Sequence, residues 1–188
     1  MNSLTQVDWS TIPAPEDDGQ AEHLTTMVMP SVSLSATDGT QVDLSKLEGL
    51  VVLYAYPMTG SPGTALPDGW DELPGARGCT PQSCAFRDHA VELEQLGVSA
   101  VFGLSTQSSE YQREAATRLN LPFSLLSDES LKLSHALRLP MLDVEGMTLT
   151  KRITLVIRDA VIVKVFYPVF PPDENANDVI AYLRSTAG

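Results

Sequence analysis

The stretch Gly78-Cys79-Thr80-Pro81-Gln82-Ser83-Cys84-Ala85-Phe86-Arg87-Asp88 contains both cysteines of the chain and marks the start of a helix. Thr80 is a capping residue type, and Pro81 suits the first helical turn. An apolar stripe at helical spacing follows, formed by Phe86, Ala90, Leu93 and Leu96. We therefore expect one helix that runs from the cysteine motif to about Gly97.

Cys79 is the candidate nucleophile because of its place at this helix start. Unpaired backbone N–H groups and a partial positive charge at a helix N-terminus favour a thiolate over a thiol. In an ideal helix the Cα atoms of Cys79 and Cys84 lie ~8.6 Å apart. A disulfide generally needs less than ~7 Å. If the two sulfurs are a redox couple, the first turn or two must unwind for them to meet.

The composition limits the classes of protein that remain. The chain has 188 residues, is 43% hydrophobic and carries 12 basic against 24 acidic residues, for a net charge of −12. Its length predicts a single core, and its charge would repel phosphate backbones and anionic lipid, so we expect neither nucleic-acid nor membrane partners. No apolar run approaches the ~18 residues of a membrane span, and the N-terminus lacks a targeting pattern. We expect a cytoplasmic protein, where two close cysteines indicate redox chemistry or metal binding.

The first half of the chain predicts an arm, a hairpin and a central strand. Residues 1–24 are rich in Pro, Asp, Glu and Gln and are expected to form an N-terminal arm, while 25–188 form one domain. Two short apolar runs flank Asp38-Gly39, which predicts a β-hairpin. The continuous apolar run 50–56, closed by Pro57, is typical of a strand buried on both faces.

After the cysteine helix, strand and helix patterns alternate. An antiparallel strand pair and a last helix follow. This order predicts an α/β fold of thioredoxin type, with a central mixed β-sheet flanked by helices and an N-terminal β-hairpin. The expected strands are 100–105, 123–126, 152–157 and 161–166, and the expected helices are 109–120, 130–139 and 174–184.

At this point the chain resembles the peroxiredoxins, and it is most similar to their PrxQ or bacterioferritin-comigratory branch. The resemblance covers roughly residues 29–184 and is most specific in the cysteine motif 78–88, where Thr, Gln, Phe and Arg-Asp stand in register with the two cysteines. Further blocks that resemble the family are 29–44, 125–129 and 152–157.

The resemblance implies an atypical two-cysteine thiol peroxidase, an antioxidant oxidoreductase with a redox-active disulfide. Cys79 would be the peroxidatic cysteine, oxidised to sulfenic acid by hydrogen peroxide or an organic hydroperoxide. Cys84 would be the resolving cysteine within the same subunit. Thioredoxin or a similar dithiol protein would reduce the disulfide, no metal, flavin or haem would be needed, and the subunit would be a monomer or a dimer.

The resemblance also assigns roles to Arg152 and Pro57. Arg152 matches the family's active-site arginine, which would favour the thiolate and hold the peroxide oxygens. Alternation along an extended strand is expected to place Thr150, Arg152 and Thr154 on one face. Pro57 matches the proline that shields the reactive cysteine.

One departure from the family pattern is large. In the family a proline, a threonine and the cysteine lie in one short stretch, whereas here residues 58–78 separate Pro57 from Cys79. Ala76 stands where the family has its threonine. Thr59 or Thr64 in the insertion could supply the missing hydroxyl, and we favour Thr59 because it follows the proline closely. The insertion is rich in Gly and Pro and is expected to form a loop over the site.

Other functions remain open from the sequence. The cysteine pair, with His89 or His135, could bind copper or zinc as in a thioredoxin-fold copper chaperone. The same pair could serve a redox-sensing interaction protein with slow turnover. Arg152 could also be an ordinary strand cation paired with Asp88 or Glu145.

Overall fold

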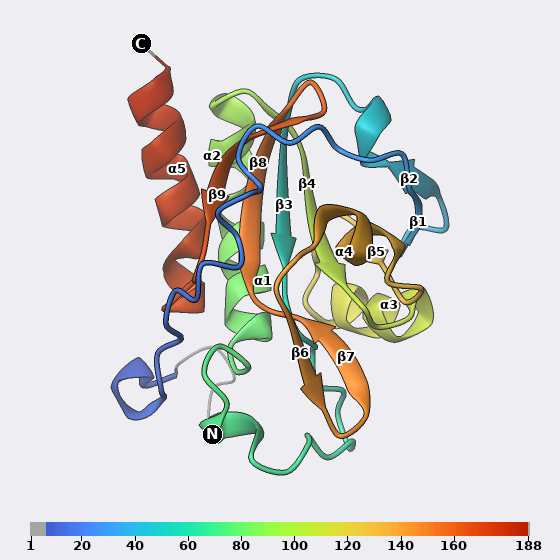
Figure 1. Ribbon diagram of the computed structural model, residues 1–188, viewed down its shortest axis with the longest axis vertical. Coiled ribbons are helices and arrows are strands. Elements are labelled where there is room, and N and C mark those ends of the chain that lie inside the picture. Colours follow the sequence, from blue (N-terminus) through green and yellow to red (C-terminus); the bar gives the residue numbers. More distant parts are fainter. Residues whose placement is uncertain (1–6, 188) are drawn as a thin grey trace.

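The computed structural model describes residues 7–187, which are built around one seven-stranded mixed sheet (Figure 1). The strand order is β2-β1-β5-β4-β3-β8-β9, and β6 and β7 form a separate two-stranded hairpin. The strands are β1 (Ser33–Ala36), β2 (Gln41–Asp43), β3 (Leu50–Ala55), β4 (Val98–Ser105), β5 (Leu125–Ser127), β6 (Met141–Val144), β7 (Met147–Thr150), β8 (Ile153–Arg158) and β9 (Val161–Phe166).

Helices cover both faces of the sheet, as the sequence predicts (Figure 1). α1, α2, α3 and α5 contribute to one apolar layer, and α4 packs into the other layer. The helices are α1 (Cys79–Asp88), α2 (Ala90–Gln95), α3 (Ser109–Arg118), α4 (Lys132–Leu137) and α5 (Asn175–Thr186), with short 3-10 turns at Trp9–Thr11, Leu44–Lys46, Trp70–Glu72 and Pro172–Glu174.

β3 is the central strand, as its continuous apolar run predicts. It pairs in parallel with β4 and antiparallel with β8, and all six of its residues are buried. Val51, Leu53 and Ala55 belong to the layer with α4, whereas Val52 and Tyr54 face α1 and α5. The ring of Tyr54 stacks on Phe86 of α1, with centroids 4.6 Å apart, so the cysteine helix is packed directly on the middle of the sheet.

The N-terminal arm lies against the domain over the part that the structure describes. Trp9 packs edge-on against Phe170, with ring centroids 5.9 Å apart. Asp18 forms a 2.7 Å ion pair with Lys151 and accepts a hydrogen bond from the Tyr167 hydroxyl. Residues 7–24 therefore contact the domain at several points. Residues 1–6 of the expected arm lie outside the described residues, and the division at residue 24 stays a prediction.

Two local expectations need correction, and one hairpin has no counterpart in the sequence prediction. The predicted helix 79–97 is two helices, because His89 has φ −99° and ψ 7° and so leaves the helical region. The β6–β7 hairpin was not predicted. Thr150, Arg152 and Thr154 do not share one strand, because Thr150 ends β7 while β8 begins only at Ile153.

Within residues 7–187, no helix has both the length and the apolar character that crossing a bilayer would require.

Gly78 is the residue that lets α1 begin where it does. Its φ of 110° lies in the left-handed region, which favours glycine. A Cβ on this residue would also lie 2.6 Å from Pro172 Cγ and 2.8 Å from Trp9 Cη2. The backbone just before Cys79 is therefore enclosed by the arm and by the segment that leads into α5.

We predict that Gly78→Ala destabilises the chain more than the matched change Gly97→Ala. Both glycines have positive φ, but a Cβ at Gly97 has no heavy atom within 4 Å. Each change costs about 1–2 kcal/mol for the left-handed backbone, and the collision at Gly78 adds about 1–3 kcal/mol. Urea unfolding of both variants measures the difference, and equal losses would contradict the close packing at Gly78.

Candidate active site

Cys79 is the first residue of α1, and its sulfur lies against a buried arginine. The residue is 4% exposed. Arg152 Nη2 donates to Cys79 Sγ at 3.2 Å, and the carbonyl oxygen of Ala76 lies 3.7 Å from the same sulfur. A cationic donor and a helix start thus converge on one sulfur.

Arg152 is held by backbone oxygens rather than by a carboxylate. Its Nη2 also donates to the carbonyl oxygens of Gly75, Ala76 and Arg77 at 3.1–3.3 Å. Within residues 7–187, the salt bridges do not include Arg152. The alternative pairing with Asp88 or Glu145 is therefore not what the structure shows. The positive charge remains available to the sulfur.

A chain of buried side chains fixes the other end of the guanidinium. Arg152 Nη1 donates to Gln82 Oε1, and Gln82 Nε2 donates to Asn175 Oδ1 at 3.0 Å. The Thr154 hydroxyl donates to the same Asn175 oxygen at 2.6 Å. These hydrogen-bonded side chains connect α1, β8 and α5, so three elements distant in sequence set the position of Arg152. Sequence reasoning missed Asn175, which no motif marks.

Cys84 is buried on the same helix, one turn and a half farther on. It is 6% exposed, and desolvation by burial raises the pKa of its thiol, against the opposing influence of nearby Arg87. Both cysteines are free thiols and α1 is intact between them. The structure is therefore the reduced state, in which the second sulfur is kept protonated and away from the first.

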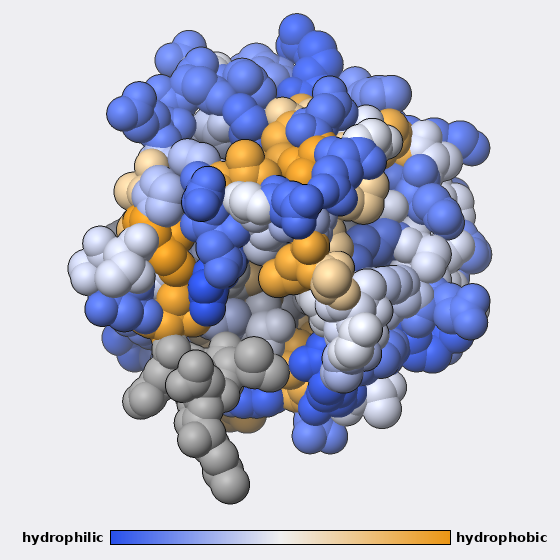
Figure 2. Space-filling view, turned by 90° about the horizontal axis from the view of Figure 1, so that it is seen from below, coloured by the Kyte–Doolittle hydropathy of each residue, from blue (hydrophilic) through white to orange (hydrophobic). Residues whose placement is uncertain are grey.

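A cleft of about 720 Å³ opens beside Cys79. Seen from below in Figure 2, this end of the molecule has apolar surface gathered around a hollow in an otherwise hydrophilic face. The insertion supplies most of the walls, as its pattern predicts. The cleft is lined by Val7, Met58, Gly60, Ser61, Pro62, Thr64, Leu66, Trp70, Asp71, Ala76, Arg77, Gly78, Cys79, Thr80, Pro81 and Arg118.

The insertion is anchored at both ends. At its start, Thr59 N–H donates to Gln107 Oε1 and Gln107 Nε2 donates back to Thr59 O, at 2.9 and 3.1 Å. Farther on, Trp70 and Ala76 pack with Val144 and Leu149 of the β6–β7 hairpin in a small apolar cluster of their own. The β6–β7 hairpin therefore supports the insertion through apolar packing.

The structure brings Cys79, Cys84 and Arg152 into one region but does not bring the Thr59 hydroxyl to the sulfur. Thr59 Oγ1 lies 3.3 Å from Gln107 Oε1, and Thr64 and Thr80 are the threonines that line the cleft. Pro57 is buried two residues after the end of β3, and its carbonyl oxygen accepts a hydrogen bond from the Ser105 hydroxyl. The shielding role expected for Pro57 stays a prediction.

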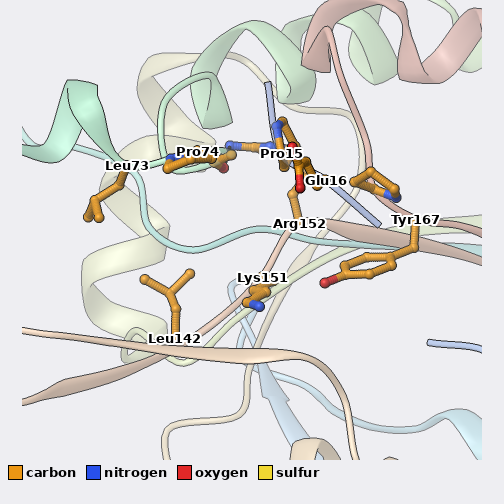
Figure 3. Close-up of a pocket in the computed structure, with 10 residues that line it drawn as sticks. Pro15, Glu16, Leu73, Pro74, Leu142, Lys151, Arg152 and Tyr167 are labelled. Atoms are coloured by element: carbon orange, nitrogen blue, oxygen red, sulfur yellow. Dashed lines mark hydrogen bonds between the residues drawn. The ribbon is translucent and has the colours of Figure 1, made fainter. Parts of the chain in front are cut away.

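A second, smaller cavity of about 280 Å³ has Arg152 in its lining (Figure 3). The N-terminal arm, the end of the insertion and the segment after β9 form its walls. Its lining consists of Pro15, Glu16, Leu73, Pro74, Gly75, Leu142, Lys151, Arg152, Tyr167 and Pro168. Arg152 lines this smaller cavity, whereas it is not among the residues that line the cleft at Cys79.

The described residues contain no group of three or more His, Cys, Asp and Glu side chains placed to hold a metal ion. His89, one of the two histidines considered for such a site, instead has its Nδ1 3.2 Å from Glu92 Oε2. His135 is exposed on α4.

Comparison with known proteins identifies relatives of this chain. A family model described as Redoxin matches residues 25–180. The chain is 35% identical over 158 residues to chloroplastic peroxiredoxin Q of Sedum lineare, which covers 83% of this chain and 75% of that protein. It is 37% identical over 103 residues to peroxiredoxin Bcp of Escherichia coli (strain K12), which covers 54% of this chain and 56% of that protein.

Solved structures show the same fold. Peroxidoxin BcpB from Mycobacterium tuberculosis has a TM-score of 0.70 at 26% identity, covering 87% of this chain and 98% of that one. Peroxiredoxin Q from Xanthomonas campestris has a TM-score of 0.67 at 22% identity, covering 87% and 99%, and shows the fold alone. These similarities confirm the predicted thioredoxin-like fold and the resemblance to the PrxQ and Bcp branch.

We predict that Arg152→Lys slows alkylation of Cys79 by iodoacetamide at pH 7, measured in a Cys84→Ser background. A lysine keeps the charge but cannot donate to the sulfur, Gln82 and three carbonyls at once, so the rate should fall about tenfold. Arg184→Lys, on an exposed α5 ion pair, is the matched control. An unchanged rate in Arg152→Lys would contradict the role assigned to the guanidinium geometry.

We also predict that burial shifts the titration of Cys84. In Cys79→Ser, the pH midpoint of Cys84 alkylation should lie above that of the same thiol in urea, because its folded-state pKa is raised. The raised pKa also makes the stability of the fold depend on pH. Protonated Cys84 stabilises the folded state below the pKa that this thiol has in the unfolded chain, and that stabilisation is lost as pH rises through its pKa in the folded chain. Superimposable alkylation profiles with and without urea would contradict the burial effect.

Proposed function

Because this chain belongs to the Redoxin family and is a thiol-dependent peroxidase of the peroxiredoxin Q and Bcp type, we propose that Cys79 is its peroxidatic cysteine and Cys84 its resolving cysteine. The observation that carries the proposal is the 3.2 Å contact between Arg152 Nη2 and Cys79 Sγ at the first residue of α1. Both thiols are near-buried, yet only Cys79 borders the cleft.

In the first step, the Cys79 thiolate attacks the terminal oxygen of a hydroperoxide. The S–O bond forms as the O–O bond breaks, which leaves Cys79 sulfenic acid and an alkoxide or hydroxide that takes a proton to become alcohol or water. Arg152 stabilises the thiolate beforehand and the negative charge that develops on the departing oxygen. The backbone carbonyls that accept hydrogen bonds from Arg152 keep its guanidinium in place, so that it need not reorganise during the reaction.

In the second step, Cys84 attacks the sulfenic sulfur, forms the disulfide and releases water. The intact helix holds the two sulfurs apart, and burial keeps Cys84 protonated. Unwinding of the first turns of α1 removes both obstacles together, since it brings Cys84 toward Cys79 and into water. The hydrogen bonds that must break include the one from Gln82 N–H to Gly78 O and the one from Gln82 Nε2 to Asn175 Oδ1.

In the third step, a thioredoxin-like dithiol protein reduces the disulfide, supplying two electrons and two protons and leaving with its own disulfide. We assign this cycle to the cytoplasm, whose reducing poise maintains such dithiols. Several plant relatives are named as chloroplastic. The subunit is assigned as a monomer or dimer, and hydrogen peroxide and organic hydroperoxides are its substrate classes.

We predict that Cys79→Ser abolishes peroxide turnover and that Cys84→Ser permits a single round of oxidation but no recycling by thioredoxin. A steady-state assay with thioredoxin and its reductase measures turnover. Intact mass after one equivalent of peroxide should show wild type as a monomeric species lighter by two hydrogens. Peroxide consumption by the double serine variant equal to that of wild type would refute the proposal, whereas disulfide formation with slow turnover would favour the redox-sensing alternative.

A further inference from the structure

We propose that the 58–78 insertion is a specificity element that binds apolar organic hydroperoxides, with Leu66 as its principal contact. This inference rests on the proposed function and adds a determinant that lies outside the cysteine motif. It concerns the wall that the insertion supplies to the cleft, not the sulfur or its arginine.

The size of the cleft is the first argument. Hydrogen peroxide has only two heavy atoms, and one water takes about 30 Å³ of liquid volume. The cleft at Cys79 measures about 720 Å³. Sites for small organic molecules measure roughly 300–1,000 Å³. The space beside the sulfur therefore matches a peroxide that carries an organic body.

The chemistry of the walls is the second argument. Met58, Leu66 and Trp70 of the insertion line the cleft together with polar and charged side chains, and Leu66 is the exposed large apolar residue among them. Leu66 is 43% exposed, although it borders a hollow rather than the open surface. A ligand with an apolar body would remove this surface from water, which favours its binding.

The wall that the insertion supplies to the cleft is formed before any ligand binds. Arg118 Nη2 donates to Gly60 O at 3.2 Å, and Arg118 is itself paired with Glu114 at 2.7 Å. A Cβ built on Gly60 would lie 3.4 Å from Leu66 Cδ2, so Leu66 packs over this fixed backbone. A preformed wall lowers the entropic cost of binding.

The direct test compares two peroxides in one set of proteins. Oxidation of Cys79 by cumene hydroperoxide and by hydrogen peroxide is followed by stopped flow in a Cys84→Ser background, with and without Leu66→Asn. Loss of the apolar contact should lower the rate constant for cumene hydroperoxide about tenfold and change that for hydrogen peroxide by less than about twofold. Val91→Asn, at an apolar residue 67% exposed on α2, is the matched control and should change neither.

A binding measurement separates this inference from the chemistry. The alcohol 2-phenyl-2-propanol, which cumene hydroperoxide would yield, should slow alkylation of Cys79 in the parent protein and protect the Leu66→Asn protein much less. Equal effects of Leu66→Asn on both peroxides, or equal protection of both proteins by the alcohol, would overturn the inference. If neither peroxide oxidises Cys79 in the parent protein, the proposed function itself fails and the inference fails with it.

Discussion

The contact between the Arg152 guanidinium and the Cys79 sulfur is the interaction on which the rest of the site depends. Burying a guanidinium costs several kcal/mol, and here three backbone carbonyls and Gln82 offset that cost in place of a carboxylate. Because no acid neutralises the cation within residues 7–187, its charge acts on the sulfur. The insertion supplies those carbonyls, so it positions Arg152 as well as lining the cleft.

The helix that begins at Cys79 also buries Cys84. In the reduced state α1 is intact, Cys84 is 6% exposed and its raised pKa makes it a poor nucleophile. In the proposed cycle, oxidation of Cys79 replaces the sulfur that contacts Arg152 at the helix start, and so weakens a contact that keeps the first turn folded. In this cycle the folded first turns of α1 and the Cys79–Cys84 disulfide exclude each other, and the oxidation state of Cys79 decides which of them is present.

Much of this follows from the sequence, because the relevant signals are local. The cysteine motif, the buried strand β3 and the Asp38-Gly39 hairpin each have their own pattern, and the structure has all three. The β6–β7 hairpin was missed although Glu145-Gly146 is a turn signal, because its apolar residues pack on the insertion, far away in sequence. Thr59 was favoured from its distance to Pro57 along the chain, whereas Gln107 determines where its hydroxyl lies.

Amide hydrogen exchange of α1, compared between the reduced and the peroxide-oxidised protein, tests most directly whether the first turns of α1 unwind when the disulfide forms. The account predicts that oxidation by one equivalent of peroxide removes protection from amides of the first turns, including Gln82 N–H, which is bonded to Gly78 O at 3.0 Å. Amides of β3 and β8 should keep their protection. An oxidised protein with a Cys79–Cys84 disulfide and undiminished protection throughout α1 would contradict the account.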